Sequence, residues 1–261
     1  MACTWETWKT CLMKAIQRFV KERGADMLNE AKRYIEECDY DGLMDWAFNN
    51  DDSSSTGEVL KSVADAYEYL IGKGYGIAAN NLGSMYYCGR YFKEDVDKAV
   101  HYYKIACDMG IPMAFGNLGC CFYYGERKDY CKAYKVFSEG AFLFNDIECL
   151  YMLGEMYQYG RYAKKHLEKA RHLYFKALDC IDSNNERDYN CIGEIHYRIG
   201  RFLIEESNDI KAGLKHLHVA LGFLYEKIDD DKFVKSNIEK AKVLVAKAED
   251  FLNVEKSEFF A

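Results

Sequence analysis

Small and aromatic residues recur at helical spacing along most of the chain, and short polar turns interrupt them. From Ala78 the run Ala-Ala-Asn-Asn-Leu-Gly-Ser-Met-Tyr-Tyr-Cys-Gly indicates a helix that ends at Gly89. A second periodic run, from about Asp95, ends at Gly110. Glycine directly after the last periodic residue is a common helix C-terminus because it accepts positive φ. The stretch 78–113 is therefore predicted to be a helix, a turn and a second helix.

This helix–turn–helix pattern repeats. Its Leu-Gly position recurs at intervals of 36, 35 and 39 residues, at Leu82-Gly83, Leu118-Gly119, Leu153-Gly154 and Ile192-Gly193. Each second helix carries a small, a large apolar and another small residue at helical spacing: Ala99, Tyr103 and Ala106; Ala133, Phe137 and Gly140; Ala170, Tyr174 and Ala177; Gly213, Leu217 and Ala220. We expect the glycine of each first helix to let the second helix pack closely. Because one such pair cannot bury its apolar face alone, the pairs are predicted to stack.

The repeat pattern divides the chain into four predicted segments. Residues 1–37 carry two amphipathic runs and are expected to form an N-terminal helical cap, and residues 38–77 a degenerate repeat. Residues 78–222 hold the four repeats, and residues 223–261 are expected to form a C-terminal capping helix. The polar residues 49–56 are predicted to be a loop, and 57–74 the helix that follows it.

The pattern Ala-x-x-x-Leu-Gly-x-x-Tyr-x-x-Gly, followed by Asp-x-x-Lys-Ala-x-x-Tyr-Tyr-x-x-Ala, resembles the Sel1-like repeat, a relative of the tetratricopeptide repeat. The match extends over 78–113, 114–144 and 149–180, and more loosely over 188–222. The resemblance implies an all-α fold, a right-handed α-α superhelix (solenoid) of helix pairs with helical caps at both ends. It also implies an adaptor or scaffold that holds a partner on a concave surface lined by the first helices.

Composition narrows the functional classes. Hydrophobic residues make up 49% of the chain and charged residues 30%, which is typical of a globular protein, and the single proline fits an almost wholly helical chain. The net charge of −7 disfavours nonspecific nucleic-acid binding. No apolar run approaches the ~18 residues of a membrane span, and the first residues do not form a signal peptide, so we expect a cytoplasmic protein without membrane insertion.

The cysteines favour the same compartment. The chain has 11 of them, and they do not recur at the repeat interval. A disulfide framework within each repeat, as in a secreted branch of the family, would need a cysteine at a fixed place in every copy. Reduced, buried thiols are therefore the preferred interpretation, although Cys180 and Cys191 could pair across one loop.

No motif predicts catalysis, a metal or a cofactor. His216 and His218 are two residues apart, so they lie on different faces of a predicted helix and cannot chelate one metal. Cys191 with Glu194 and His196 could suggest a nucleophile and a base, but we interpret His196 as filling the aromatic position of the fourth repeat. The chain is accordingly predicted not to be an enzyme.

The predicted function is protein–protein interaction in the concave groove, with a protein or peptide partner. The packing residues of each first helix point away from this groove, so the residues between them are expected to face it. These are Asn80, Asn81, Ser84, Tyr87, Asn117, Tyr123, Tyr124, Tyr151, Glu155, Gln158, Asn190, Glu194, Tyr197 and Arg198. Lysines are scarce among them, which fits poorly with a clamp for a C-terminal carboxylate. The alternative function is a peptide-sensing regulator whose groove binds a short peptide.

Two features of the groove allow more than one interpretation. Asn81 and Asn117 share a repeat position that, in related tetratricopeptide repeats, clamps a peptide backbone. Equally, these amides could bond to a neighbouring repeat. Basic residues from Arg161 to Lys176 and acidic ones from Glu36 to Asp52 form two charged clusters, which we interpret as solvated faces. The sharper hypothesis is that the basic side docks an acidic partner.

Overall fold

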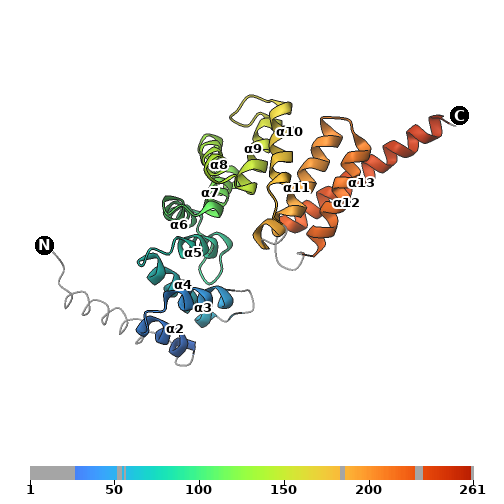
Figure 1. The fold of residues 1–261 in the computed structure, drawn as a ribbon. Coiled ribbons are helices and arrows are strands. Elements are labelled where there is room, and N and C mark those ends of the chain that lie inside the picture. Colours follow the sequence, from blue (N-terminus) through green and yellow to red (C-terminus); the bar gives the residue numbers. More distant parts are fainter. Residues whose placement is uncertain (1–26, 52–54, 56, 183–185, 227–231, 260–261) are drawn as a thin grey trace. The chain divides into compact units, whose positions relative to one another are not determined.

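The computed structural model describes residues 27–51, 55, 57–182, 186–226 and 232–259. Most of the expected N-terminal cap, residues 1–26, lies outside this part of the chain. The described residues form helices and no strand (Figure 1). The helices are α2 (Met27–Glu36), α3 (Tyr40–Asn50), α4 (Gly57–Ile71), α5 (Gly76–Cys88), α6 (Val96–Asp108), α7 (Pro112–Tyr124), α8 (Tyr130–Phe144), α9 (Ile147–Tyr159), α10 (Leu167–Asp179), α11 (Glu186–Glu205), α12 (Ile210–Tyr225) and α13 (Lys232–Phe259). The predicted all-α class is confirmed.

The helices form two compact units that divide between Cys121 and Phe122, within α7. The first unit contains α2 to α6 and most of α7. The second contains the end of α7 and α8 to α13. Consecutive helices pack as pairs within each unit: α3 with α4 and α5 with α6 in the first, and α9 with α10 and α11 with α12 in the second.

The predicted helix ends are confirmed where the repeat is most regular. α5 ends at Cys88, and Gly89 follows in the left-handed conformation with φ of 69°. Gly160 follows α9 in the same way, with φ of 65°. The second helix of the pair begins after Asp95, whose carboxylate accepts a hydrogen bond from the Lys98 backbone N–H. In the degenerate repeat the boundaries differ from the prediction: α3 continues to Asn50, and α4 ends at Ile71.

Close helix pairing depends on the repeated glycines. A Cβ added at Gly83 would lie 2.8 Å from the Tyr103 ring of α6, and one at Gly154 would lie 2.8 Å from the Tyr174 ring of α10. The small–large–small residues predicted on the second helices are buried, including Ala99, Tyr103, Ala106, Ala133, Phe137, Ala170, Tyr174, Ala177, Leu217 and Ala220. In these two pairs, the aromatic ring of the second helix therefore fills the space that the missing side chain leaves.

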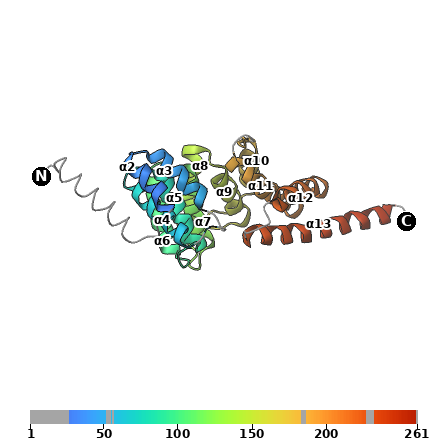
Figure 2. The same ribbon diagram turned by 90° about the horizontal axis from the view of Figure 1, so that it is seen from below.

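At its C-terminal end the second unit has a core shared by three helices. Tyr197 of α11 and Leu217, Ala220 and Leu224 of α12 pack with Ile238 and other buried residues of α13. Figures 1 and 2 show α13 beside α11 and α12 over its first part and extending past them towards the C-terminus. The apolar stripe at the start of α13 thus covers the last helix pair.

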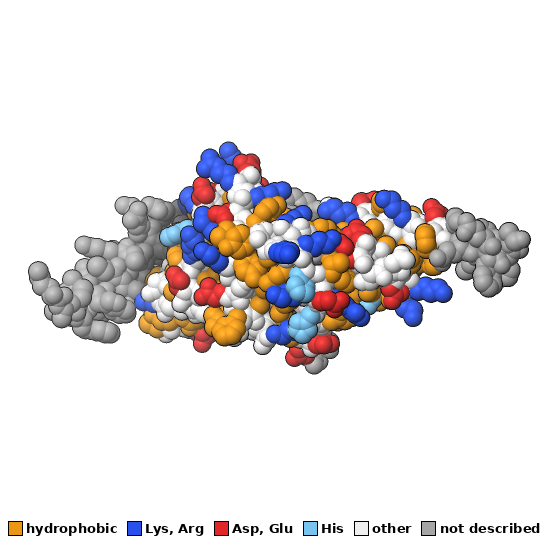
Figure 3. Space-filling view, turned by 90° about the horizontal axis from the view of Figure 1, so that it is seen from above, with side chains coloured by type: hydrophobic (Ala, Val, Ile, Leu, Met, Phe, Trp, Pro, Cys, Tyr) orange, Lys and Arg blue, Asp and Glu red, His pale blue; other side chains and the backbone are white. Residues whose placement is uncertain are grey.

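None of the helices in the described ranges is both long and apolar enough to cross a membrane. On the face shown in Figure 3, basic and acidic side chains are interspersed, with apolar side chains between them.

Candidate functional site

In the first unit, the groove residues predicted from sequence bond to one another. The Asn117 side chain donates a hydrogen bond to Asn80 Oδ1 at 2.8 Å, and Asn80 donates to Asn81 Oδ1 at 3.3 Å. Asn81 donates in turn to the Tyr67 hydroxyl at 3.3 Å. Asn80 is buried and the other two asparagines are half-buried. These amides link α4, α5 and α7, which favours the interpretation that they bond to a neighbouring repeat. Their role as a clamp for a peptide backbone stays a prediction.

Ser84 and Tyr87 are half-buried in the same unit. The Arg90 guanidinium donates to Ser84 Oγ at 3.3 Å and forms an ion pair with Asp51 at 3.1 Å. Burial raises the pKa of the Tyr87 hydroxyl well above its ordinary value. Tyr87 therefore stays a neutral hydroxyl at physiological pH.

In the second unit, two predicted groove residues belong to the interior. Gln158 is fully buried, and its Oε1 accepts a hydrogen bond from the Tyr174 hydroxyl of α10 at 2.7 Å. The Gln158 amide thus bonds to the second helix of its own repeat, and a part for it in partner binding stays a prediction. Tyr151 is 5% exposed and packs its ring under the Arg198 guanidinium, 4.4 Å from the ring centroid. The side chain of Asn190 lies outside the described residues.

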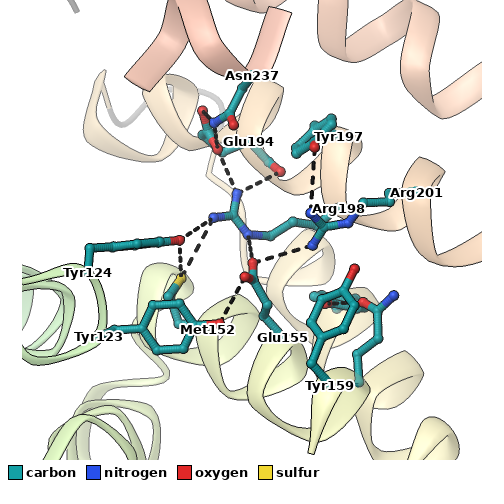
Figure 4. Close-up of polar contacts among 12 residues, drawn as sticks. Tyr123, Tyr124, Met152, Glu155, Tyr159, Glu194, Tyr197, Arg198, Arg201 and Asn237 are labelled. Carbon is teal, nitrogen blue, oxygen red and sulfur yellow. Dashed lines mark hydrogen bonds and ion pairs between the residues drawn. The ribbon is translucent and has the colours of Figure 1, made fainter. Parts of the chain in front are cut away.

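Five other predicted residues come together around one pocket of about 230 Å³ in the second unit: Tyr123, Tyr124, Glu155, Tyr197 and Arg198. The rest of its lining consists of Lys128, Tyr130, Arg161, Arg201, Asn237 and Lys240. We call this the tyrosine–arginine pocket (Figure 4). It collects side chains from the end of α7, the start of α8, from α9, α11 and α13, and from the turns after α7 and α9.

The centre of the tyrosine–arginine pocket is the buried carboxylate of Glu155 (Figure 4). It accepts hydrogen bonds from the Tyr123 hydroxyl at 2.9 Å and from Arg198 Nε at 3.2 Å. Arg161 Nη1 lies 3.4 Å away and Arg201 Nη2 3.5 Å away. Burial alone would raise the pKa of Glu155, but the charges of Arg198 and Arg201 outweigh it and lower the pKa. Glu155 is therefore ionised at neutral pH.

Arg198 is the most heavily bonded cation of the tyrosine–arginine pocket. Besides Glu155, it pairs with Glu194 at 2.6 Å and donates to the Tyr124 hydroxyl at 3.4 Å. The amide of Asn237 on α13 donates to both Glu194 oxygens, at 2.8 and 2.9 Å. Burial works against the charged form of Arg198, but the Tyr124 hydroxyl and the two carboxylates raise its pKa. Its guanidinium is thus fixed in orientation and charge.

Sequence reasoning missed the other two arginines. Arg161 was assigned to a solvated basic cluster, but its guanidinium donates to the Tyr123 hydroxyl and lies 4.9 Å from the Tyr123 ring centroid. Arg201 lies over the rings of Tyr159 and Tyr197, at 5.2 and 5.3 Å. Arg201 was recognisable in principle, because it stands three residues after Arg198 and so shares its helix face. Arg161 lies in the turn after α9, where the sequence has no periodic pattern that could predict the contact of its side chain with Tyr123.

The histidines form a pair that the sequence did not predict. His216 contacts His196 across α11 and α12, with 3.0 Å between their Nδ1 atoms. Burial and the charge of His216 lower the pKa of His196 to about 4, and burial lowers the pKa of His216. Both rings are therefore neutral at physiological pH, and one ring donates to the other. The expectation that His196 occupies the aromatic position of the fourth repeat fits its half-buried place on α11.

The tyrosine–arginine pocket suits binding better than proton transfer. Its one acid is held ionised, and its arginines are held protonated, with the pKa of Arg201 raised by Glu155 against the effect of burial. Neither can readily exchange a proton at neutral pH. Within the described ranges, three or more His, Cys, Asp or Glu side chains nowhere gather in a way that could hold a metal ion. The pocket is a rigid array of hydrogen-bond donors.

The fold defines an all-α repeat protein built from paired helices. The Sel1 repeat family matches three segments of the chain, residues 76–111, 116–137 and 147–181. By sequence, no curated protein matches it.

The fold is shared with several solved structures. A protective antigen of uropathogenic Escherichia coli with an SLR fold is 20% identical, with a TM-score of 0.54, over 87% of this chain and 49% of the antigen, so the chain spans about half the antigen's length. A Sel1 repeat protein from Oxalobacter formigenes is 17% identical, with a TM-score of 0.50, over 84% and 99% of the two chains. Immunity protein Pa5087 from Pseudomonas aeruginosa is 14% identical, with a TM-score of 0.51, over 80% of this chain and 82% of the immunity protein. At these identities the likeness concerns the fold alone.

Proposed function

We propose that the chain is a non-enzymatic adaptor or scaffold that binds a partner protein or peptide in the groove lined by the first helices of its repeats. Sel1 repeats generally mediate protein–protein interaction. The observation that carries the proposal is the tyrosine–arginine pocket, because five predicted groove residues from three first helices line it. Tyrosine and arginine are also the residue types that dominate binding energy at protein interfaces.

The chemistry of the tyrosine–arginine pocket supports binding without turnover. Rigid, pre-oriented donors lower the entropic cost of association, because they need not be ordered when the partner arrives. Tyr124 contributes a ring that is 39% exposed, and its hydroxyl is held by Arg198. A partner side chain can therefore contact the ring without displacing the ion pairs behind it.

The alternative function, a peptide-sensing regulator, uses the same surface but needs the groove to change on binding. The asparagine chain through Asn117, Asn80 and Asn81 in the first unit is the natural place for such a change, because a peptide backbone could replace these internal hydrogen bonds. An Asn81→Ala and Asn117→Ala double variant distinguishes the roles. Lost binding with an unchanged melting temperature indicates a clamp, and a lowered melting temperature indicates a structural role.

The proposed function is tested by affinity capture from the source cell followed by native mass spectrometry of the complex. The expected result is a protein partner at fixed stoichiometry, retained poorly by Tyr124→Ala and fully by Tyr225→Ala. Tyr225 is a fair control because it lies in the same unit, is 43% exposed and does not line the tyrosine–arginine pocket. Equal retention by the two variants, or recovery of a small molecule in place of a protein, overturns the proposal.

A further inference from the structure

The tyrosine–arginine pocket carries an excess of positive charge in a chain whose net charge is −7. Among the described residues, five cationic side chains line it, and Glu155 is the only acidic residue of the lining. Glu194 neutralises part of this charge through Arg198, from just behind the lining. Positive charge remains even after both carboxylates are counted. A site of this composition attracts an anion.

The internal ion pairs do not use all the donors of the tyrosine–arginine pocket. Arg201 Nε is buried and has no hydrogen-bond partner among the residues that the structure describes. Its Nη2 lies 3.5 Å from Glu155 but also lacks a hydrogen bond of acceptable geometry. Buried donors without an acceptor are uncommon, and each is costly to leave unsatisfied. The internal contacts therefore neutralise the Arg201 guanidinium incompletely, and the exposed ammonium groups of Lys128 and Lys240 add further charge to the lining.

The size of the tyrosine–arginine pocket limits what it can hold. At about 230 Å³ it is smaller than the roughly 300–1,000 Å³ typical of sites for whole small molecules. It suits one side chain of a larger partner. Its lining is mostly polar, and the guanidinium fork of its arginines matches the planar geometry of a carboxylate.

From these observations we propose that the tyrosine–arginine pocket is an anion-binding site that takes the carboxylate of an aspartate or glutamate side chain from an acidic segment of the partner protein. The inference rests on the proposed function and adds the chemistry of the partner. The Arg201 guanidinium lines the pocket and contributes the positive charge that the carboxylate meets. Lys128 and Lys240 attract the acidic segment, and Glu155 holds the Arg198 and Arg201 guanidiniums in place.

The test is isothermal titration calorimetry of the full chain at low salt with a short peptide of alternating glutamate and glycine, acetylated and amidated at its ends. The control peptide carries glutamine in place of glutamate. The pocket variant is Lys128→Gln with Lys240→Gln, and its match is Lys135→Gln with Lys247→Gln. The matched pair changes the net charge equally at exposed lysines of the same unit that do not line the pocket.

We expect the acidic peptide to bind and the glutamine peptide not to bind. The pocket variant should weaken binding about tenfold, the size of one charge-assisted contact, and the matched variant less than about twofold. In the wild-type chain, the acidic peptide should also shift the side-chain N–H resonance of Arg201 Nε. This readout needs no substitution at a residue that supports the fold.

Several outcomes overturn the inference. If the glutamate and glutamine peptides bind equally, the carboxylate is not what the pocket recognises. If the two lysine variants weaken peptide binding equally, the attraction is diffuse and not specific to the pocket. An unshifted Arg201 resonance places the peptide elsewhere, and displacement of the peptide by low millimolar inorganic phosphate identifies a phosphate site instead. If the acidic peptide does not bind but partner capture still depends on Tyr124, the inference is wrong while the proposed function stands.

Discussion

Replacing Glu155 with glutamine tests whether the tyrosine–arginine pocket is assembled as described. The side chain keeps its shape but loses the charge that faces three guanidiniums. The Glu155 and Arg198 side chains are each 8% exposed and Arg201 is 15% exposed, so water screens their interaction weakly. Removing one member of a buried ion pair leaves an uncompensated charge, and measured losses are about 3–5 kcal/mol. We expect Glu155→Gln to lower the free energy of unfolding by this amount.

The assay for this prediction is urea denaturation followed by circular dichroism at neutral pH, with Glu139→Gln as the control. Glu139 is an exposed residue of α8, so the same chemical change should alter the free energy of unfolding by no more than about 0.5 kcal/mol. A double variant with Arg201→Gln should lose less than the sum of the two single losses, because it removes one of the stranded charges. A Glu155→Gln loss no larger than that of Glu139→Gln, or strictly additive losses, would refute the reasoning.

Two further predictions concern the packing and the histidine pair. Gly154→Ala should destabilise the chain by about 1–2 kcal/mol, because the new Cβ would lie 2.8 Å from the Tyr174 ring and the overpacking exceeds the gain in helix propensity. Gly222→Ala should stabilise the chain by up to about 1 kcal/mol, because among the described residues no atom lies within 4 Å of the new Cβ in this helix. Denaturation midpoints that move the same way in both variants would contradict this prediction. The depressed pKa of His196 means that the unfolded chain takes up protons first, so stability is full above about pH 6.5 and falls towards pH 4. His196→Phe should reduce the stability difference between pH 7 and pH 5, and an unchanged pH profile would show that the pair is not buried in solution.

Much of the fold could be predicted from sequence because its determinants are local. The residues Gly83, Tyr103 and Ala106 act within one helix pair, at spacings that the sequence displays directly. The N-cap at Asp95 and the left-handed Gly89 likewise depend on a few neighbouring residues. Because the same small, aromatic and glycine positions recur in later repeats, the sequence pattern is unambiguous.

The candidate site was harder to predict because its geometry is not periodic. Sequence placed Glu155 and Arg198 in the groove, and both line the tyrosine–arginine pocket. It gave no indication that the turn after α9 brings Arg161 against Tyr123, or that α13 adds Asn237 beside Glu194. Repeat position also gave no indication that Gln158 bonds to Tyr174, because residues at the edge of a helix face can turn to either neighbour. Periodicity predicts which face a residue lies near but not which long side chains meet there.

The central claim is that the chain binds its partner at the tyrosine–arginine pocket. It is tested most directly by placing a photo-crosslinking amino acid at Tyr124 and, in a matched protein, at Tyr225. The two positions are 39% and 43% exposed, so they are about equally accessible to a partner. We predict a crosslink to a partner protein from position 124 and none from position 225. Crosslinks of equal yield from both positions, or a crosslink from 225 alone, would contradict the account.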